Sequence, residues 1–197
     1  MASRSRSALR KSALHKSAPR RASKAKKPSA AKSAVAKSAT AAKVGKLPEW
    51  NLTDLYAGIG APEVGRDLDR MDAECAAFAA DYKGKLAEET AKPDGGGRWL
   101  ARAVQRYEAI DDLAGRLGSY AGLIHAGDSV DPAISKFYGD VSERLTAASV
   151  NLLFFALELN RIDDAVIEQA MQTPELAHYR PWIEDSRKDK PYQLEDR

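Results

Sequence analysis

Cysteine is almost absent from this 197-residue chain, and Cys75 is the only one. A single thiol excludes a disulfide within the chain and cannot form a cysteine cluster for a metal. It fits a reducing compartment. Cys75 lies on the apolar stripe of an expected helix. We therefore predict that it is a small buried packing residue rather than a reactive thiol.

Long apolar runs are missing as well. No stretch of 18 consecutive apolar residues occurs, which argues against a segment that crosses a membrane. The beginning of the chain also lacks the apolar core of a secretory signal. We expect a cytoplasmic protein that has no membrane partner.

The usual catalytic and metal-binding motifs do not occur. The sequence contains no Gly-x-Ser-x-Gly and no His-Glu-x-x-His, and the loop Pro93–Gly97 lacks the Gly-Lys-Ser/Thr ending of a phosphate-binding loop. The histidines His15, His125 and His178 are far apart in the sequence, and His125 is better explained by a favourable interaction with a helix C-terminus. We predict no catalytic, cofactor-binding or metal-binding residue in this chain.

Paired acidic residues occur but do not predict an acid–base site. Adjacent residues of a helix point to different faces, so each pair is expected to be solvated surface. The pairs are Glu88–Glu89, Asp111–Asp112, Asp163–Asp164 and Glu184–Asp185.

Acidic residues are entirely absent from residues 1–46, which contain 14 lysines and arginines. Residues 47–197 contain the other 17 basic residues and all 28 acidic ones, a formal charge of −11. The segment 1–46 is rich in Ala, Ser and Lys and has no aromatic residue, so we predict a disordered tail. Only this tail could attract a nucleic-acid backbone, because the acidic part would repel phosphate.

Three roles for the tail stay open: an inert extension, a histone-tail-like arm, and a transit peptide. Pro19 and Pro28 interrupt the amphipathic helix that a transit peptide would form. We favour the inert extension and expect only weak, nonspecific contact with nucleic acid.

Residues 47–197 show helical apolar periodicity and no strand-like alternation. One helix is predicted to begin at Pro62, which suits a first helical position, and to end at Gly84. A longer one is predicted from Trp99 to Ile124. The apolar positions are Leu68, Met71, Cys75, Phe78 and Tyr82 in the first, and Leu100, Val104, Tyr107, Ile110, Leu113, Leu117 and Tyr120 in the second.

Three glycines interrupt the second helix on nearly one face. Gly115, Gly118 and Gly122 each cost a helix about 1 kcal/mol relative to alanine. We predict that the close approach of another helix or of a ligand backbone offsets this cost, and we favour another helix.

The third helix has the clearest signals. Asp131 can cap it, Pro132 can open it, and heptad spacing of apolar residues continues to Leu159. We predict one continuous helix of about 28 residues, roughly 40 Å long, packed against an antiparallel neighbour. A self-associating coiled coil is the alternative.

Shorter helices should follow. Asn160 can end the third helix, and Asp163 can cap a short helix that reaches Met171. Thr173–Pro174 can start another, which Pro181 breaks or kinks. The prediction is an all-α, antiparallel helical bundle or lobe over residues 47–197, preceded by the disordered tail.

Five short segments form an ordered set: Trp50–Tyr56, Phe78–Leu86, Gly115–Ala121, Leu153–Asp163 and Arg187–Tyr192. Together they resemble the N-terminal region of oligoendopeptidase F-type zinc metallopeptidases, relatives of thimet oligopeptidase. The resemblance covers residues 48–197.

The resemblance implies a helical lobe that flanks a deep channel and limits entry to short, unstructured peptides. In that family the His-Glu-x-x-His helix and a further zinc-binding glutamate lie beyond the region that this chain resembles. Zinc would activate water there, with a glutamate as base. No catalytic residue is carried over to this chain. Zinc is expected only in the missing catalytic domain.

Two functions follow as hypotheses. The favoured one is the non-catalytic N-terminal lobe of a zinc oligoendopeptidase, inactive alone, whose partners are the missing catalytic domain and short peptides. Because Leu194–Arg197 resembles the approach to another element, we expect a chain truncated before that domain, with an uncovered apolar face that promotes association. The alternative is a free-standing helical interaction protein with a nucleic-acid-binding basic arm.

Overall fold

The computed structural model describes residues 50–194. The chain divides into two units, Met1–Leu47 and Pro48–Arg197, and every described residue belongs to the second. The predicted disordered tail lies outside the described residues.

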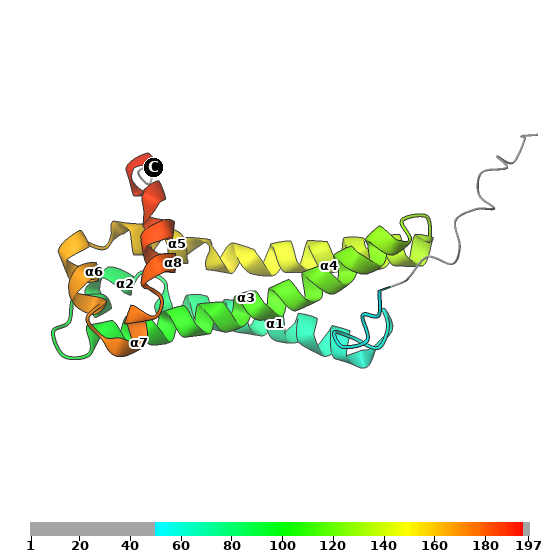
Figure 1. Ribbon diagram of the computed structural model, residues 1–197, viewed down its shortest axis with the longest axis horizontal. Coiled ribbons are helices and arrows are strands. Elements are labelled where there is room, and N and C mark those ends of the chain that lie inside the picture. Colours follow the sequence, from blue (N-terminus) through cyan, green and yellow to red (C-terminus); the bar gives the residue numbers. More distant parts are fainter. Residues whose placement is uncertain (1–49, 195–197) are drawn as a thin grey trace, which may run out of the picture. The chain divides into compact units, whose positions relative to one another are not determined.

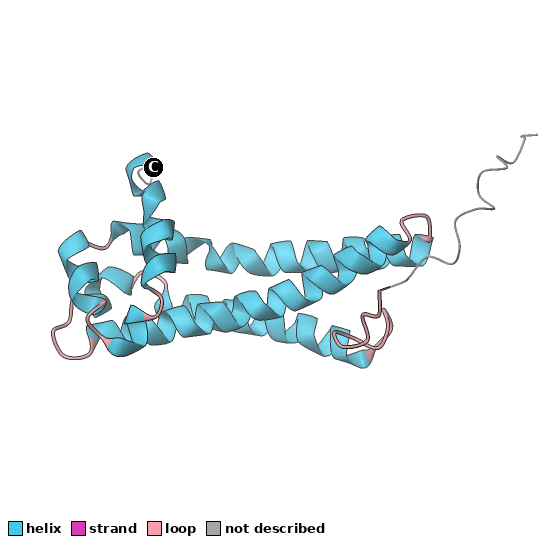
Figure 2. Ribbon diagram, viewed as in Figure 1, coloured by secondary structure: helices cyan, strands magenta, loops and turns pink. Residues whose placement is uncertain are grey.

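Helices joined by short loops make up the described part, and no strand occurs between residues 50 and 194 (Figure 2). The prediction of an all-α fold is confirmed. The α-helices are α1 (Pro62–Tyr82), α2 (Leu86–Thr90), α3 (Gly96–Gly127), α4 (Pro132–Ser149), α5 (Leu153–Arg161), α6 (Asp164–Ala170), α7 (Pro174–Ala177) and α8 (Arg180–Ser186), and the 3₁₀ helices are η2 (Val150–Leu152) and η3 (Arg187–Tyr192).

The three longest helices pack against one another. Helix α3 runs antiparallel to both α1 and α4, and each of these three helices contacts the other two (Figure 1). The shorter helices α2, α5, α6, α7 and α8 gather at the end of the bundle where α3 begins. The predicted antiparallel packing is therefore correct.

Aromatic rings join these helices in the core. Phe78 of α1 is fully buried, and its ring centroid lies 5.1 Å from that of Phe155 on α5 and 6.0 Å from that of Tyr107 on α3. Such edge-to-face and tilted pairs add to the stabilisation from apolar burial. The predicted burial of Cys75 is confirmed, because its side chain is fully enclosed.

Helix ends follow the predicted local chemistry. Pro62 opens α1, and Gly84 takes a φ of 79° just after it. The Asp131 carboxylate accepts hydrogen bonds from the amides of Ala133 and Ile134, at 2.7 and 3.3 Å. The Asp163 carboxylate accepts one from Ala165 at 2.8 Å. These side chains satisfy amides that have no partner inside the helix.

The prediction of one continuous third helix is wrong. The helical path breaks into α4, the 3₁₀ turn η2 and α5. Near the break, the hydroxyls of Thr146 and Ser149 donate to the carbonyls of Ser142 and Thr146, and the Asn151 amide donates to the carbonyl of Ala148. Polar side chains that bond to the preceding turn compete with regular helical bonding and favour a 3₁₀ turn here.

The prediction that three glycines permit close helix packing is also wrong. A Cβ on Gly115 or Gly122 would meet nothing within 4 Å, and one on Gly118 would lie 3.6 Å from Leu145 Cδ1, an ordinary contact. The buried face of α3 is formed instead by Leu117, Tyr120 and their neighbours.

Glycines that permit close approach lie at the start of α3. A Cβ on Gly96 would overlap the carbonyl oxygen of Thr90, and one on Gly97 would overlap Thr173 Oγ1. Gly95, with a φ of 96°, precedes the helix. Helix α3 thus begins at Gly96, three residues before the predicted start at Trp99.

Two short helices, α2 and α8, were not predicted. Helix α2 is a single turn that buries Leu86, too short to show periodicity. The helix that begins at Pro174 already ends at Ala177, and Pro181 lies in the first turn of α8 rather than only breaking a helix.

Among the described residues, no single helix is long and apolar enough to cross a membrane; only the bent pair Pro132–Arg161 and Asp164–Ala170 passes that test together, across a 103° bend.

Candidate functional site

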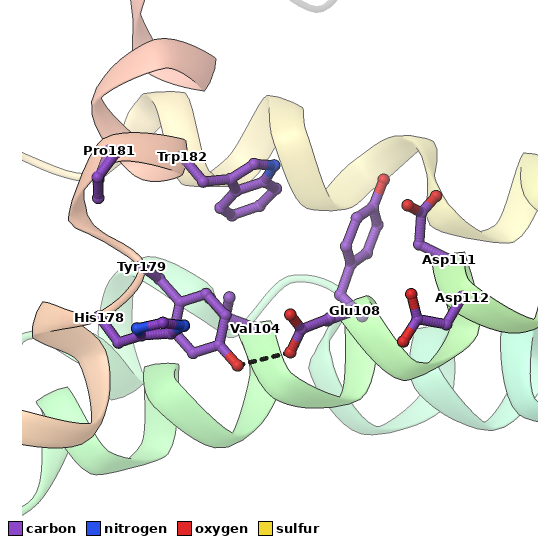
Figure 3. A pocket seen from close by; sticks show the side chains of 9 residues that line it. Val104, Glu108, Asp111, Asp112, His178, Tyr179, Pro181 and Trp182 are labelled. Atoms are coloured by element: carbon purple, nitrogen blue, oxygen red, sulfur yellow. Dashed lines mark hydrogen bonds between the residues drawn. The ribbon is translucent and has the colours of Figure 1, made fainter. Parts of the chain in front are cut away.

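A cleft of about 380 Å³ lies between α3 and the segment that joins α7 to α8 (Figure 3). Its walls combine acidic and aromatic side chains. They are Val104, Tyr107, Glu108, Asp111, Asp112, His178, Tyr179, Pro181 and Trp182.

Helical spacing on α3 brings the acidic residues to one wall. Positions 104, 107, 108, 111 and 112 recur at intervals of three and four, so their side chains share one face. Prolines at 174 and 181 start new helices across from them and position Tyr179 and Trp182. The cleft therefore joins parts of the chain about 70 residues apart.

One hydrogen bond crosses the cleft. The hydroxyl of Tyr179 donates to the Glu108 carboxylate at 2.6 Å, as Figure 3 shows. This bond, together with partial desolvation and the negative charge of Glu108, raises the pKa of Tyr179 above its ordinary value. The phenol therefore stays protonated and holds Glu108 in place at neutral pH.

Aromatic packing forms the floor. The ring of Tyr107 stacks on Phe155 at a centroid distance of 4.9 Å and lies 5.9 Å from the ring of Trp182. Burial, and next the charge of Asp111, raises the pKa of Tyr107. The floor of the cleft is thus continuous with the aromatic core.

The acidic pair Asp111–Asp112 is exposed at the mouth of the cleft, as predicted for solvated surface. Within residues 50–194, neither carboxylate has an ion-pair or hydrogen-bond partner. The other predicted pairs are exposed too, except that Glu89 is half-buried and bonds to Lys92 at 2.5 Å.

A second hollow, also about 380 Å³, continues along α3 from the first. Tyr107 and Asp111 line both hollows, so we treat the two as one surface and call it the α3 groove. The second hollow is mainly apolar. Its lining is completed by Met71, Ala114, Leu145, Thr146, Ser149, Leu152, Leu153 and Ala156.

Zinc does not fit the described residues. Between residues 50 and 194, no group of three His, Cys, Asp or Glu side chains is placed to hold a metal ion. His125 stacks on Tyr138 with centroids 4.7 Å apart in the last turn of α3, and His178 packs beside Tyr179. His15 lies outside the described residues.

The surroundings of Cys75 do not favour a nucleophilic thiolate. Its pKa is raised, first by burial and then by the negative charges of Asp72 and Glu74. A catalytic thiol needs the opposite shift.

Arg187 is a structurally important residue whose role was not predicted. Its guanidinium donates to the carbonyl oxygens of Leu159 and Ile162, the latter at 2.8 Å, and pairs with Asp164 at 2.5 Å. Lys190 also bonds to Asp164, at 2.6 Å, and these two cations lower the pKa of that carboxyl. The sequence signal was the basic run in Arg187–Tyr192, but its target carbonyls are visible only in the fold.

The segment that Arg187 anchors is also the one that matches a protein-family model. Residues 158–197, which include the end of α5, helices α6, α7 and α8, and η3, match the family model described as oligopeptidase F, a model of the N-terminal region of M3 peptidases. No curated protein and no solved structure matches the chain. The match supports an M3-type N-terminal region in this part of the chain.

Proposed function

We propose that this chain is the non-catalytic, helical N-terminal lobe of a zinc-dependent oligoendopeptidase that hydrolyses short peptides. The observation that carries this proposal is the family match over residues 158–197. The matched residues that the structure describes are mostly helical, and their apolar side chains join the core of the bundle, which suits a preformed lobe.

The catalytic group belongs elsewhere in this proposal. The 197 residues contain no His-Glu-x-x-His, and the described side chains offer no metal-binding group. Zinc and its ligands would come from a catalytic segment outside this chain. That segment and short peptides are the proposed partners, and the cytoplasm is the proposed location.

Peptide hydrolysis tests the proposal directly. The purified full chain is incubated with a quenched fluorescent peptide, with zinc, without zinc, and with a chelator. We expect no hydrolysis under any of these conditions. Zinc-dependent, chelator-sensitive cleavage that copurifies with the chain would contradict it.

The DNA immediately downstream provides an independent test. An in-frame continuation that encodes His-Glu-x-x-His would support the lobe and remove the alternative of a free-standing protein. A downstream sequence that encodes no such motif in any frame would count against the lobe.

The unequal charge of the two parts favours a second candidate function. Residues 1–46 carry 14 basic and no acidic residues, so they could act as a nucleic-acid-binding arm on a helical interaction protein. Deletion of residues 1–46 should then abolish salt-sensitive binding to a DNA duplex. Binding that survives the deletion would exclude this function for the tail.

A further inference from the structure

The α3 groove leaves large apolar side chains in contact with water. Leu153 is 64% exposed and Trp182 is 38% exposed, and both line the groove. Val150 and Leu157 flank Leu153 at helical spacings of three and four residues and are 61% and 43% exposed. A group of exposed apolar side chains beside a hollow is typical of an interaction surface.

The opposite rim of the groove carries negative charge without a matching cation. Asp111 and Asp112 have no basic partner among residues 50–194, and Glu108 accepts a hydrogen bond only from the neutral Tyr179. Some acidic residues elsewhere on the bundle are paired, as Asp69 and Asp72 are with Arg144. The rim therefore favours a cationic partner.

The shape of the groove favours a helix. It runs along α3 and is bounded on its other side by α4, η2 and α5. A hollow between two packed helices accepts the apolar face of a third, as in helix-in-groove recognition.

From these three observations, we propose that the α3 groove binds an amphipathic helix of a partner protein. Apolar side chains of that helix fill the hollow between Leu145 and Leu153. Its lysines or arginines lie against Glu108, Asp111 and Asp112. This role does not depend on the oligopeptidase proposal, and a failure of either leaves the other standing.

A designed peptide pair tests the proposal. One 18-residue helical peptide carries leucines on one face and lysines along one edge of that face, and the other has glutamates in place of the lysines. Each is titrated into the full 197-residue chain by calorimetry. We expect the lysine peptide to bind with a Kd of roughly micromolar order, and the glutamate peptide at least about tenfold more weakly.

Variants of the chain locate the binding. The double variant Asp111→Asn, Asp112→Asn should weaken binding of the lysine peptide about three- to tenfold. The matched control, Glu88→Gln with Glu143→Gln, removes the same charge from exposed positions outside the groove and should leave the Kd unchanged. Leu153→Ser, at an exposed position that the fold does not need, should weaken binding about tenfold.

Three results would overturn the proposal: no binding of the lysine peptide, equal binding of the two peptides, or equal weakening by the control variant. Sedimentation of the full chain tests whether a second copy of the chain, rather than a partner helix, occupies the groove. A dimer that Leu153→Ser dissociates, with no peptide binding, would assign the groove to a second copy of the chain and likewise overturn the proposal.

Discussion

The hydroxyl of Tyr56 donates a 2.8 Å hydrogen bond to the carboxylate of Asp67 and so fastens the segment before α1 to that helix. Tyr56 is only 3% exposed, and its ring packs edge-on against Tyr120 at a centroid distance of 5.0 Å. The guanidinium of Arg116 lies 4.6 Å above the same ring. Tyr56, which precedes α1 in the chain, is therefore built into the core.

Tyr56→Phe should lower the free energy of unfolding by about 1 kcal/mol at neutral pH, because Asp67 loses a hydrogen-bond donor. Urea unfolding followed by circular dichroism measures the change. Tyr192→Phe is the control, since Tyr192 is 83% exposed. Equal stability of the two variants would show that the Tyr56–Asp67 bond contributes nothing.

The raised pKa of Tyr56 predicts that the protein loses stability at alkaline pH. Burial, then the hydrogen bond and the charge of Asp67, raises the pKa of Tyr56 well above the ordinary value of 10.0. The unfolded chain then ionises first as pH rises, so the contribution of Tyr56 is fully present below about pH 10 and is lost above it. Tyr56→Phe should reduce the decrease in unfolding free energy between pH 9 and 11. An unchanged decrease would contradict the assignment.

Arg187→Met should destabilise the segment that matches the oligopeptidase F model. The carbonyls of Leu159 and Ile162 would lose a charged donor, at a cost of roughly 2–3 kcal/mol. Arg187→Lys should not restore it, because an ammonium cannot reproduce the planar fork that reaches both carbonyls. Hydrogen exchange of α8 measures the local effect.

Lys188→Ala is the matched control for Arg187→Met. Its side chain is 75% exposed and pairs only with Asp185 within the described part, so the substitution should leave the free energy of unfolding nearly unchanged. Full rescue by Arg187→Lys would show that charge alone, and not geometry, holds the segment.

Elements set by local chemistry could be predicted from the sequence. Pro62, Asp131 and Asp163 mark helix starts because a fixed φ or a cap hydrogen bond involves only residues within one turn. The burial of Cys75 followed from its place on an apolar stripe. These features need no knowledge of distant contacts.

Features set by tertiary contacts could not be predicted in this way. The heptad pattern up to Leu159 gave no sign that polar side chains would break the helix near Asn151. The groove depends on Tyr107, Tyr179 and Trp182, which come together only when the segment after α7 lies against α3. The sequence alone does not show the contact between Glu108 and Tyr179, because 71 positions separate them.

Cys75 should be inert in the native protein. It is 0% exposed, and burial raises its pKa, so both access and thiolate formation are disfavoured. A thiol reagent at pH 7.5 should react with the native chain at least about a hundredfold more slowly than with the urea-unfolded chain, because reaction requires opening of the core. Comparable rates in the two states would place Cys75 at the surface.

Two glycines of α3 offer a matched pair of alanine substitutions with opposite expected effects on the free energy of unfolding. Gly97→Ala should lower the free energy of unfolding by about 1–3 kcal/mol, since the new methyl would overlap Thr173 Oγ1 and lie 2.8 Å from the carbonyl oxygen of Ala170. Gly115→Ala should raise it by up to about 1 kcal/mol, because the position is helical, exposed and open. Urea unfolding of both variants measures the difference. A Gly115→Ala variant that is as unstable as Gly97→Ala would mean that a second helix does approach Gly115 closely, and would restore the packing role first expected for the glycines within α3.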